Sequence, residues 1–251
     1  MAEALPILRP GAVALVSGAS RGIGLAIVEA LVARKVRVVA LARRKAPLAA
    51  LAGRLGEAVH PVVLDVRDAE ACAGLVEALP PAWRAIDILV NNAGADVGGR
   101  RDFAVGEIAD WAGTIETNVI GLMRTTRAVL PGMLARGRGH IVNLGSISGT
   151  RALAGQVAYT TSKAAIAMFS QSLRAELKES AIRVSEIRPG TVRTDFAEVR
   201  FRGDAGRAAA FYDSFKAVLS AEDVARTVLF ALEQPPHVAI AELLVLPTGQ
   251  A

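Results

Sequence analysis

The chain has 251 residues, of which 52% are apolar, 4% aromatic and 21% charged, and its formal net charge is +5. Few aromatic residues and scattered arginines argue against a nucleic-acid partner, which would need a basic stripe with stacking side chains. No run of 18 apolar residues predicts a membrane span, and the N-terminal residues lack the pattern of a secretory signal.

The few cysteines and histidines limit the chemistry further. Cys72 is the only cysteine, so no internal disulfide can form, and a reducing, cytoplasmic location is expected. His60, His140 and His237 are isolated along the chain, whereas metal binding needs clustered ligands. We therefore expect no metal site.

A dinucleotide-binding pattern lies near the N-terminus. An apolar run predicts a buried strand over 12–17, and a helical pattern follows over 22–34. Between them, Gly18 permits a tight turn, Gly22 lets the backbone approach a pyrophosphate, and Gly24 lets the helix pack closely on the strand. The helix N-terminus offers unpaired N–H groups to phosphates. The cofactor-binding residues predicted in this turn are Gly18, Ser20, Arg21, Gly22, Ile23 and Gly24.

The second strand, predicted over 36–41, indicates which nucleotide is bound. NAD sites place an Asp or Glu about 20 residues after the glycines, where it binds the ribose 2′-hydroxyl. No acid stands there, and Arg43 and Arg44 instead offer planar, permanently charged groups to a 2′-phosphate. We therefore expect NADP(H), with a solvated basic loop as the alternative reading of these arginines.

Helices and strands alternate to the C-terminus without a linker-like stretch, so we expect one domain over residues 1–251. Further helices are predicted over 46–55, 68–79, 107–135, 157–179, 205–217 and 221–233, and strands over 59–64, 86–91, 139–145, 182–187 and 239–246. Right-handed crossovers between parallel strands place helices on both faces of the sheet. The sequence predicts an α/β fold, a Rossmann-like doubly wound parallel sheet of about seven strands.

Tyr159 and Lys163 are four residues apart, about one helical turn, so their side chains should share one helix face. A nearby positive charge favours the phenolate and lowers the pKa of a phenol. A phenol tuned in this way can exchange a proton with a substrate oxygen. Ser146 follows the strand predicted over 139–145 and could hydrogen-bond the same oxygen.

These features together resemble the short-chain dehydrogenase/reductase family. The glycines have the spacing GxxxGxG, and the family's other motifs follow in the same order over essentially the whole chain. They are Asn91-Asn92-Ala93-Gly94, Asn118, the set of Ser146, Tyr159 and Lys163, and Pro189-Gly190.

The resemblance implies hydride transfer between a nicotinamide and a carbinol or carbonyl carbon. Tyr159 is then the general acid/base, Ser146 positions the oxygen, and Lys163 lowers the pKa of Tyr159 and holds the nicotinamide ribose. Asn118 is expected to organise a water molecule, or alternatively to bend or cap its helix. Beyond the glycine turn and the arginine pair, the implied cofactor contacts are Asp65, Val66, Asn92, Ala93, Gly94, Tyr159, Lys163, Pro189, Gly190, Thr191 and Thr194.

Three stretches resemble a subgroup, the NADP-dependent 3-hydroxy acid dehydrogenases that also oxidise serine and allo-threonine. They are AVLPGMLARGRGHIVNLGS, FAEVRFRGDAGRAAAFY and HVAIAELLVLPTGQ. The carboxylate of such a substrate invites a cation, and the candidates are Arg100, Arg151, Arg193, Arg200 and Arg202. The alternatives are a bulkier ketone or alcohol, a β-keto ester, and a non-catalytic NADP(H)-binding sensor.

Three further expectations concern segment 190–220, the two long helices and Lys35. Segment 190–220 combines glycines, charges and aromatic residues, which predicts a mobile lid over the active site. The helices predicted over 107–135 and 157–179 are interface helices in the family, so a homotetramer, or a homodimer, is expected. Lys35 stands where the family often has Gly, so its backbone is expected to avoid the left-handed conformation.

Overall fold

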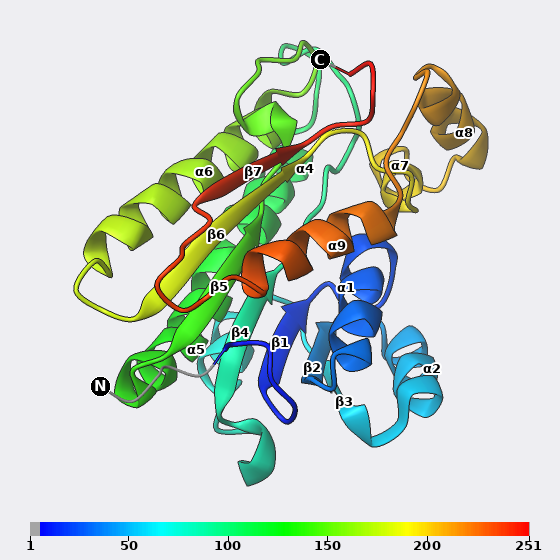
Figure 1. Cartoon of the computed structure of the whole chain (residues 1–251). Coiled ribbons are helices and arrows are strands. Elements are labelled where there is room, and N and C mark those ends of the chain that lie inside the picture. Colours follow the sequence, from blue (N-terminus) through cyan, green and yellow to red (C-terminus); the bar gives the residue numbers. More distant parts are fainter. Residues whose placement is uncertain (1–5, 251) are drawn as a thin grey trace.

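The structure is a computed structural model that describes residues 6–250. In this part of the chain, parallel strands form one seven-stranded sheet in the order β3-β2-β1-β4-β5-β6-β7 (Figure 1). The strands are β1 (Val13–Ser17), β2 (Arg37–Ala42), β3 (Val59–Val63), β4 (Ile86–Asn91), β5 (Gly139–Leu144), β6 (Ile182–Pro189) and β7 (Glu242–Val245). The order reverses between β1 and β4, which creates a crevice at the carboxyl ends of these two strands.

Helices cover both faces of the sheet, as the sequence predicts. They are α1 (Gly22–Ala33), α2 (Lys45–Leu55), α3 (Ala69–Ala73), α4 (Ile108–Ile115), α5 (Gly121–Arg136), α6 (Val157–Glu176), α7 (Phe196–Arg200), α8 (Ala205–Asp213) and α9 (Ala221–Leu232). Short helical turns are η1 (Gly56–Ala58), η2 (Pro81–Trp83), the π-helical η3 (Glu116–Ile120) and η4 (Ile147–Gly149). None of the helices within residues 6–250 combines the length and apolarity needed to cross a bilayer.

The core is divided by the sheet into two apolar clusters. Successive residues of β1 point to opposite faces, so Ala14 and Val16 join one cluster while Val13 and Leu15 join the other. Helices α1, α2 and α9 cover the first face, and α3, α5 and α6 cover the second. All five residues of β1 are buried, as expected of a central parallel strand.

Two predicted helices differ from those observed. The helix predicted over 68–79 begins after the cap residue Asp68 but ends at Ala73, where Gly74 follows and turns replace the helix. The helix predicted over 107–135 is interrupted by the π-helical turn η3. This wide turn contains Asn118, whose side chain bonds the backbone of Ala95 in both directions. The terminal strand is also shorter than predicted, covering Glu242–Val245.

The expectation for Lys35 is wrong, because its φ is +61°, in the left-handed region. Its N–H donates to the carbonyl of Val32 at 2.8 Å, and its carbonyl accepts from Gly11 at 3.0 Å. These bonds close the end of α1 where a Gly is usual. The left-handed backbone costs about 1–2 kcal/mol, and the exposed side chain adds no clash with the core.

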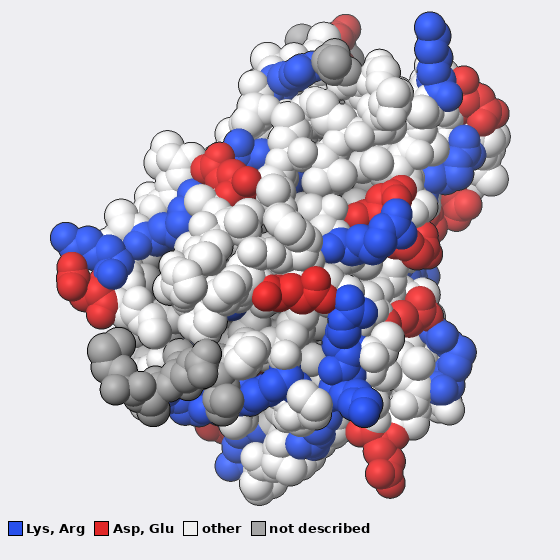
Figure 2. Space-filling view, viewed as in Figure 1, with Lys and Arg blue, Asp and Glu red and all other residues white. Residues whose placement is uncertain are grey.

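Segment 190–220 projects from one corner of the molecule, beyond the carboxyl ends of the strands (Figure 1). It carries α7 and α8, and the helix predicted over 205–217 ends earlier, at Asp213. A small separate cluster holds the two helices together, with Ala197, Ala208 and Tyr212 at its centre. On the face drawn in Figure 2, basic and acidic side chains are interspersed and no broad patch carries one sign.

Candidate active site

A cavity of about 510 Å³ lies at the carboxyl edge of the sheet, where the segments after all seven strands meet α6 and segment 190–220. It brings together residues that lie far apart in the sequence. Of the predicted site residues, it is lined by Gly18, Ser20, Arg21, Gly22, Ile23, Arg43, Arg44, Asp65, Val66, Asn92, Ala93, Gly94, Ser146, Tyr159, Lys163, Pro189, Gly190, Thr191 and Thr194. Two predicted residues, Gly24 and Asn118, lie behind this lining.

The glycine turn is compact because neighbouring groups leave no room for side chains. Gly18 has a φ of +67°, which suits a residue without a Cβ. A Cβ on Gly24 would collide with the carbonyl of Gly18 and the amide of Asn92. The Asn92 amide itself donates to the carbonyl of Ser17 at 2.9 Å and braces the turn.

The N-terminus of α1 faces this turn with its N–H groups uncapped. Arg21 occupies the cap position without a side-chain hydrogen bond to the helix, and the first turn carries no acidic residue. Free N–H groups and the positive end of the helix dipole suit a phosphate. The arrangement therefore fits the pyrophosphate of a dinucleotide.

The charged groups around the nucleotide end are partly paired with one another. Arg21 forms an ion pair of 2.7 Å with Asp195 of segment 190–220. Asp65 pairs with Arg67 at 2.7 Å, and the hydrogen bond from Arg67 is the main cause that lowers the pKa of Asp65. Arg43 lies 3.9 Å from Asp65, and both Arg43 and Arg44 are exposed at the cavity. Sequence reasoning missed Arg67, which lies in the loop after β3, two residues beyond Asp65.

The catalytic set predicted from the sequence meets at the other end of the cavity. Ser146 follows β5, and its Oγ accepts from the N–H of Ser148 at 3.1 Å, which fixes it at the start of η4. Tyr159 lies in the first turn of α6, with the Lys163 ammonium 5.8 Å from its ring centre. Lys163 Nζ donates to the carbonyl of Leu144 at 2.8 Å. Ser146 and Lys163 are each only 8% exposed.

The electrostatics of Tyr159 differ from the prediction. Burial raises the pKa of Tyr159, and it outweighs the opposing effects of the Arg200 cation and the Ser146 side chain. Burial also lowers the pKa of Lys163 to about 8, against the effect of Glu186. The cation that acts on the phenol in this structure is therefore Arg200, which the sequence did not single out for this role.

Asn118 is fully buried in η3, and both polar atoms of its side-chain amide are hydrogen-bonded. Its Oδ1 accepts from the N–H of Ala95 at 2.7 Å, and its Nδ2 donates to the Ala95 carbonyl at 2.9 Å and to Ser162 at 3.0 Å. The side chain thereby ties the loop after β4 to α6. Its place in a π-helical turn agrees with the helix-distorting reading, and the water-organising role stays a prediction.

The loop after β6 is fixed by Gln250, which sequence reasoning missed, and by Tyr212, an aromatic residue of segment 190–220. Gln250 bonds Thr191 twice, accepting from its N–H and donating to its Oγ1, each at 2.9 Å. The Tyr212 hydroxyl donates to the carbonyl of Thr194 at 2.8 Å. The Oγ1 of Thr194 also accepts from the N–H of Phe196 at 3.2 Å.

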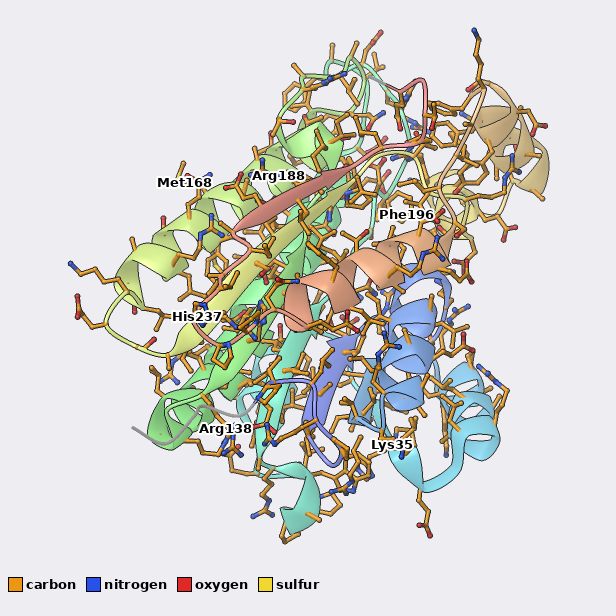
Figure 3. The ribbon with its side chains drawn as sticks, viewed as in Figure 1. Lys35, Arg138, Met168, Arg188, Phe196 and His237 are labelled. Carbon is orange, nitrogen blue, oxygen red and sulfur yellow. The ribbon has the colours of Figure 1, made fainter. Side chains whose placement is uncertain are left out.

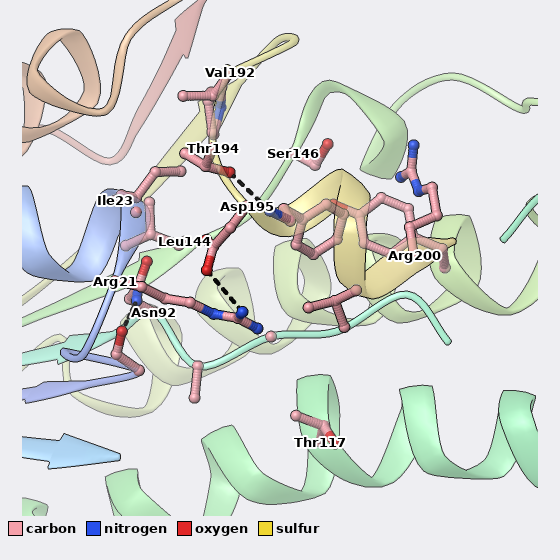
Figure 4. Close-up of a pocket in the computed structure, with 18 of the residues that line it drawn as sticks. Arg21, Ile23, Asn92, Thr117, Leu144, Ser146, Val192, Thr194, Asp195 and Arg200 are labelled. Atoms are coloured by element: carbon pink, nitrogen blue, oxygen red, sulfur yellow. Dashed lines mark hydrogen bonds and ion pairs between the residues drawn. The ribbon is translucent and has the colours of Figure 1, made fainter. Parts of the chain in front are cut away.

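Segment 190–220 adds a cationic and aromatic wall. Figure 4 shows Arg200 and Ser146 at the same end of the pocket. The Arg200 guanidinium lies 5.6 Å from the ring centre of Tyr159 and pairs with Asp96 at 2.7 Å. No pattern in the sequence signals Asp96, which follows the NNAG motif by two positions.

Comparisons with known proteins agree with this geometry. The short chain dehydrogenase family model matches residues 12–204. The chain is 42% identical over 239 residues to a probable NADP-dependent dehydrogenase of Haemophilus influenzae, covering 95% of this chain and 94% of that protein. It is 40% identical over 240 residues to the NADP-dependent 3-hydroxy acid dehydrogenase YdfG of Escherichia coli K12, covering 95% and 96%.

Solved structures show the same architecture. The closed form of a serine dehydrogenase complexed with NADP⁺ matches with a TM-score of 0.92 at 40% identity, covering 95% of this chain and 96% of that one. An actinorhodin polyketide ketoreductase with NADPH matches with a TM-score of 0.83 at 31% identity, covering 94% and 95%. The chain therefore belongs to the short-chain dehydrogenase family.

Proposed function

We propose that this protein is an NADP(H)-dependent oxidoreductase that transfers hydride between the nicotinamide and the carbinol carbon of a small 3-hydroxy acid. The observation that carries the proposal is the meeting of Ser146, Tyr159 and Lys163 in the same cavity as the glycine turn and the uncapped N-terminus of α1. Relatives that cover nearly the whole chain are named for this chemistry.

The residues divide the proton chemistry among themselves. Tyr159 donates a proton to the carbonyl oxygen or takes one from the carbinol, and Ser146 holds the same oxygen by a hydrogen bond. Lys163, anchored on the Leu144 carbonyl one helical turn from Tyr159, would hold the nicotinamide ribose. When bound, the nicotinamide supplies or accepts the hydride, while the chain provides position and charge.

The cofactor contacts follow the lining of the cavity. The glycine turn and the uncapped α1 N-terminus would hold the pyrophosphate, and Arg43 and Arg44 would hold the 2′-phosphate of NADP(H). In the absence of Asp or Glu at the end of β2, nothing there favours an unphosphorylated ribose. The double variant Arg43→Ala/Arg44→Ala should raise KM for NADP⁺ with little effect on KM for NAD⁺, and equal effects on both would contradict the assignment.

The substrate proposal is tested by turnover of the purified protein. NADP⁺ and, separately, NAD⁺ are offered with L-serine, L-allo-threonine and 3-hydroxyisobutyrate, and the reduced nicotinamide is followed by absorbance. We expect turnover with NADP⁺ well above that with NAD⁺. Binding of NADPH without oxidation of any of these acids would contradict the hydroxy-acid proposal and direct the search to bulkier ketones, alcohols and β-keto esters. Unchanged cellular function in a turnover-dead Tyr159→Phe variant would instead indicate a sensor.

We also propose a cytoplasmic homotetramer, with a homodimer as the alternative, and with neither nucleic acid nor membrane as a partner. Exposed apolar side chains on α6 support an interface there, and Figure 3 shows Met168 on the outer side of this helix. The single cysteine, Cys72, is free and buried, which suits a reducing compartment. Segment 190–220 would act as the lid that closes over the bound substrate.

A further inference from the structure

The structure separates the five arginines that the sequence offers as partners for a substrate carboxylate. Arg193 is exposed and pairs with Asp213, and Arg202 is exposed and pairs with Asp110. Neither these two nor the exposed Arg151 lines the cavity. Of the five candidates, Arg100 and Arg200 line the cavity.

These two arginines occupy different positions in the pocket. Arg100 is exposed, and its guanidinium donates to the Gln156 amide oxygen when that amide is oriented to accept. Arg200 is only 6% exposed and packs against the rings of Tyr159 and Phe196, with centroid distances of 5.6 Å and 5.2 Å. Arg200 is therefore the cation placed beside the general acid/base.

We infer that Arg200, oriented from behind by the buried carboxylate of Asp96, binds the carboxylate of the substrate. The inference rests on the proposed hydroxy-acid function and names the residue that makes the pocket selective for an acid. A 3-hydroxy acid carries its carboxylate two carbons from the carbinol. A cation beside Tyr159 is thus within reach when the hydroxyl of the same molecule meets the phenol.

Asp96 explains how the Arg200 cation is tolerated in this buried, aromatic environment before substrate binds. An unpaired buried guanidinium would be costly, and the carboxylate of Asp96, at 2.7 Å from Arg200 Nε, offsets that cost. Asp96 is 4% exposed and does not line the cavity, whereas Arg200 does. The carboxylate therefore stands behind the arginine as seen from the pocket, as a positioning residue.

The pairing leaves part of the guanidinium available. The ion pair of Asp96 is with Nε of Arg200, at 2.7 Å, and within residues 6–250 neither of these two atoms has a partner in hydrogen-bond geometry. A guanidinium fork matches a carboxylate through two parallel N–H bonds, and an orienting partner reduces the entropy lost on binding. The aromatic rings around Arg200 exclude water, which strengthens such a bond.

The test compares an acid with its neutral counterpart, 3-hydroxyisobutyrate and its methyl ester, as substrates of the full chain with NADP⁺. Arg200→Gln should lower the ratio of kcat/KM for acid over ester by about tenfold to a hundredfold, the scale of a charged hydrogen bond. Changes in the pKa of Tyr159 affect both substrates alike and cancel in this ratio. Arg151→Gln, an exposed arginine outside the cavity, is the matched control and should leave the ratio within about threefold of the wild type.

A second variant separates loss of carboxylate binding from loss of folding. Arg200→Gln leaves Asp96 buried without its partner, so Asp96→Asn/Arg200→Gln, which removes both charges, should show the same loss of acid preference. An acid preference that survives in both variants, or that collapses in Arg100→Gln instead, would overturn the assignment of Arg200. A wild-type protein that oxidises the ester but not the acid would overturn the proposed function itself, and with it this inference.

Discussion

In the proposed mechanism Tyr159 carries the proton chemistry, and its hydroxyl can be removed without disturbing the ring. Tyr159→Phe keeps the contact with Phe196, whose ring centre is 5.9 Å away, but cannot exchange a proton. We expect turnover to fall about 10²–10⁴-fold, while NADPH still binds. Steady-state rates and a titration of NADPH fluorescence would measure the two effects. Tyr212→Phe removes the other phenol of the chain, which braces Thr194, so this variant should affect NADPH binding more than kcat, and an equal loss of kcat in both variants would contradict the role of Tyr159.

His140 makes stability depend on pH at a distance from the active site. It lies fully buried in β5, 2.8 Å from Ser185 Oγ, and burial lowers its pKa from 6.5 to about 3, with Arg183 adding to the effect. Between these two values the unfolded chain binds a proton that the folded chain does not. The contribution of neutral His140 to the free energy of unfolding should therefore be greatest above pH 6.5 and decrease as the pH is lowered towards about 3.

The size of this effect can be read from urea unfolding at pH 7 and pH 4.5. His140 should account for a loss of about 2–3 kcal/mol between the two conditions. His140→Gln should reduce the difference by that amount, whereas His60→Gln, on the edge strand β3, should keep it. The same pH difference in His140→Gln as in the wild type would show that other groups titrate instead.

At the scale of elements, the contact between α1 and the glycine turn links packing to cofactor binding. A Cβ on Gly24 would meet the Gly18 carbonyl and the Asn92 amide, and Asn92 braces the turn. Gly24→Ala should cost about 1–3 kcal/mol of stability through overpacking, and it should weaken NADPH binding. Thermal unfolding with and without NADPH would measure both effects.

Gly53→Ala is the matched control for this prediction. Gly53 lies in α2, and a Cβ there would meet no atom within 4 Å. Because Ala has the higher helix propensity, this variant should be more stable than the wild type by up to about 1 kcal/mol, with unchanged NADPH binding. Equal behaviour of the two variants would mean that the close approach at Gly24 does not matter.

Elements that depend on local sequence could be predicted, and those that depend on distant contacts could not. The strand, glycine turn and helix over residues 12–34 follow from apolar periodicity and three glycines. The π-helical turn depends on Asn118 reaching Ala95, 23 positions away. The left-handed Lys35 depends on a bond from Gly11, which comes from before β1. Such partners are not visible within a sequence window.

The candidate site shows the same limit at the scale of the whole molecule. Ser146 and Asn92 could be placed because they follow strands, and parallel strands end at one edge of the sheet. Asp96 and Arg200 are more than 100 positions apart, and they meet only because segment 190–220 folds back over the loop after β4. Their buried pairing therefore required the structure.

The outer surface predicts how copies of the chain associate. Met168 on α6 is 60% exposed, and Leu244 on the edge strand β7 is 54% exposed, although both are large apolar side chains. Apolar groups gathered on an outer face are typical of subunit interfaces. Light scattering after size exclusion should give four times the monomer mass of 26.2 kDa.

Met168→Glu should reduce this mass to that of a dimer or a monomer, because a buried unpaired carboxylate at the centre of an interface costs more than one apolar contact supplies. Val63→Glu is the matched control, since Val63 is 54% exposed at the opposite edge of the sheet, on β3, away from α6. We expect that variant to keep the wild-type mass. A wild-type mass of 26.2 kDa, or an unchanged mass in Met168→Glu, would exclude α6 as the interface.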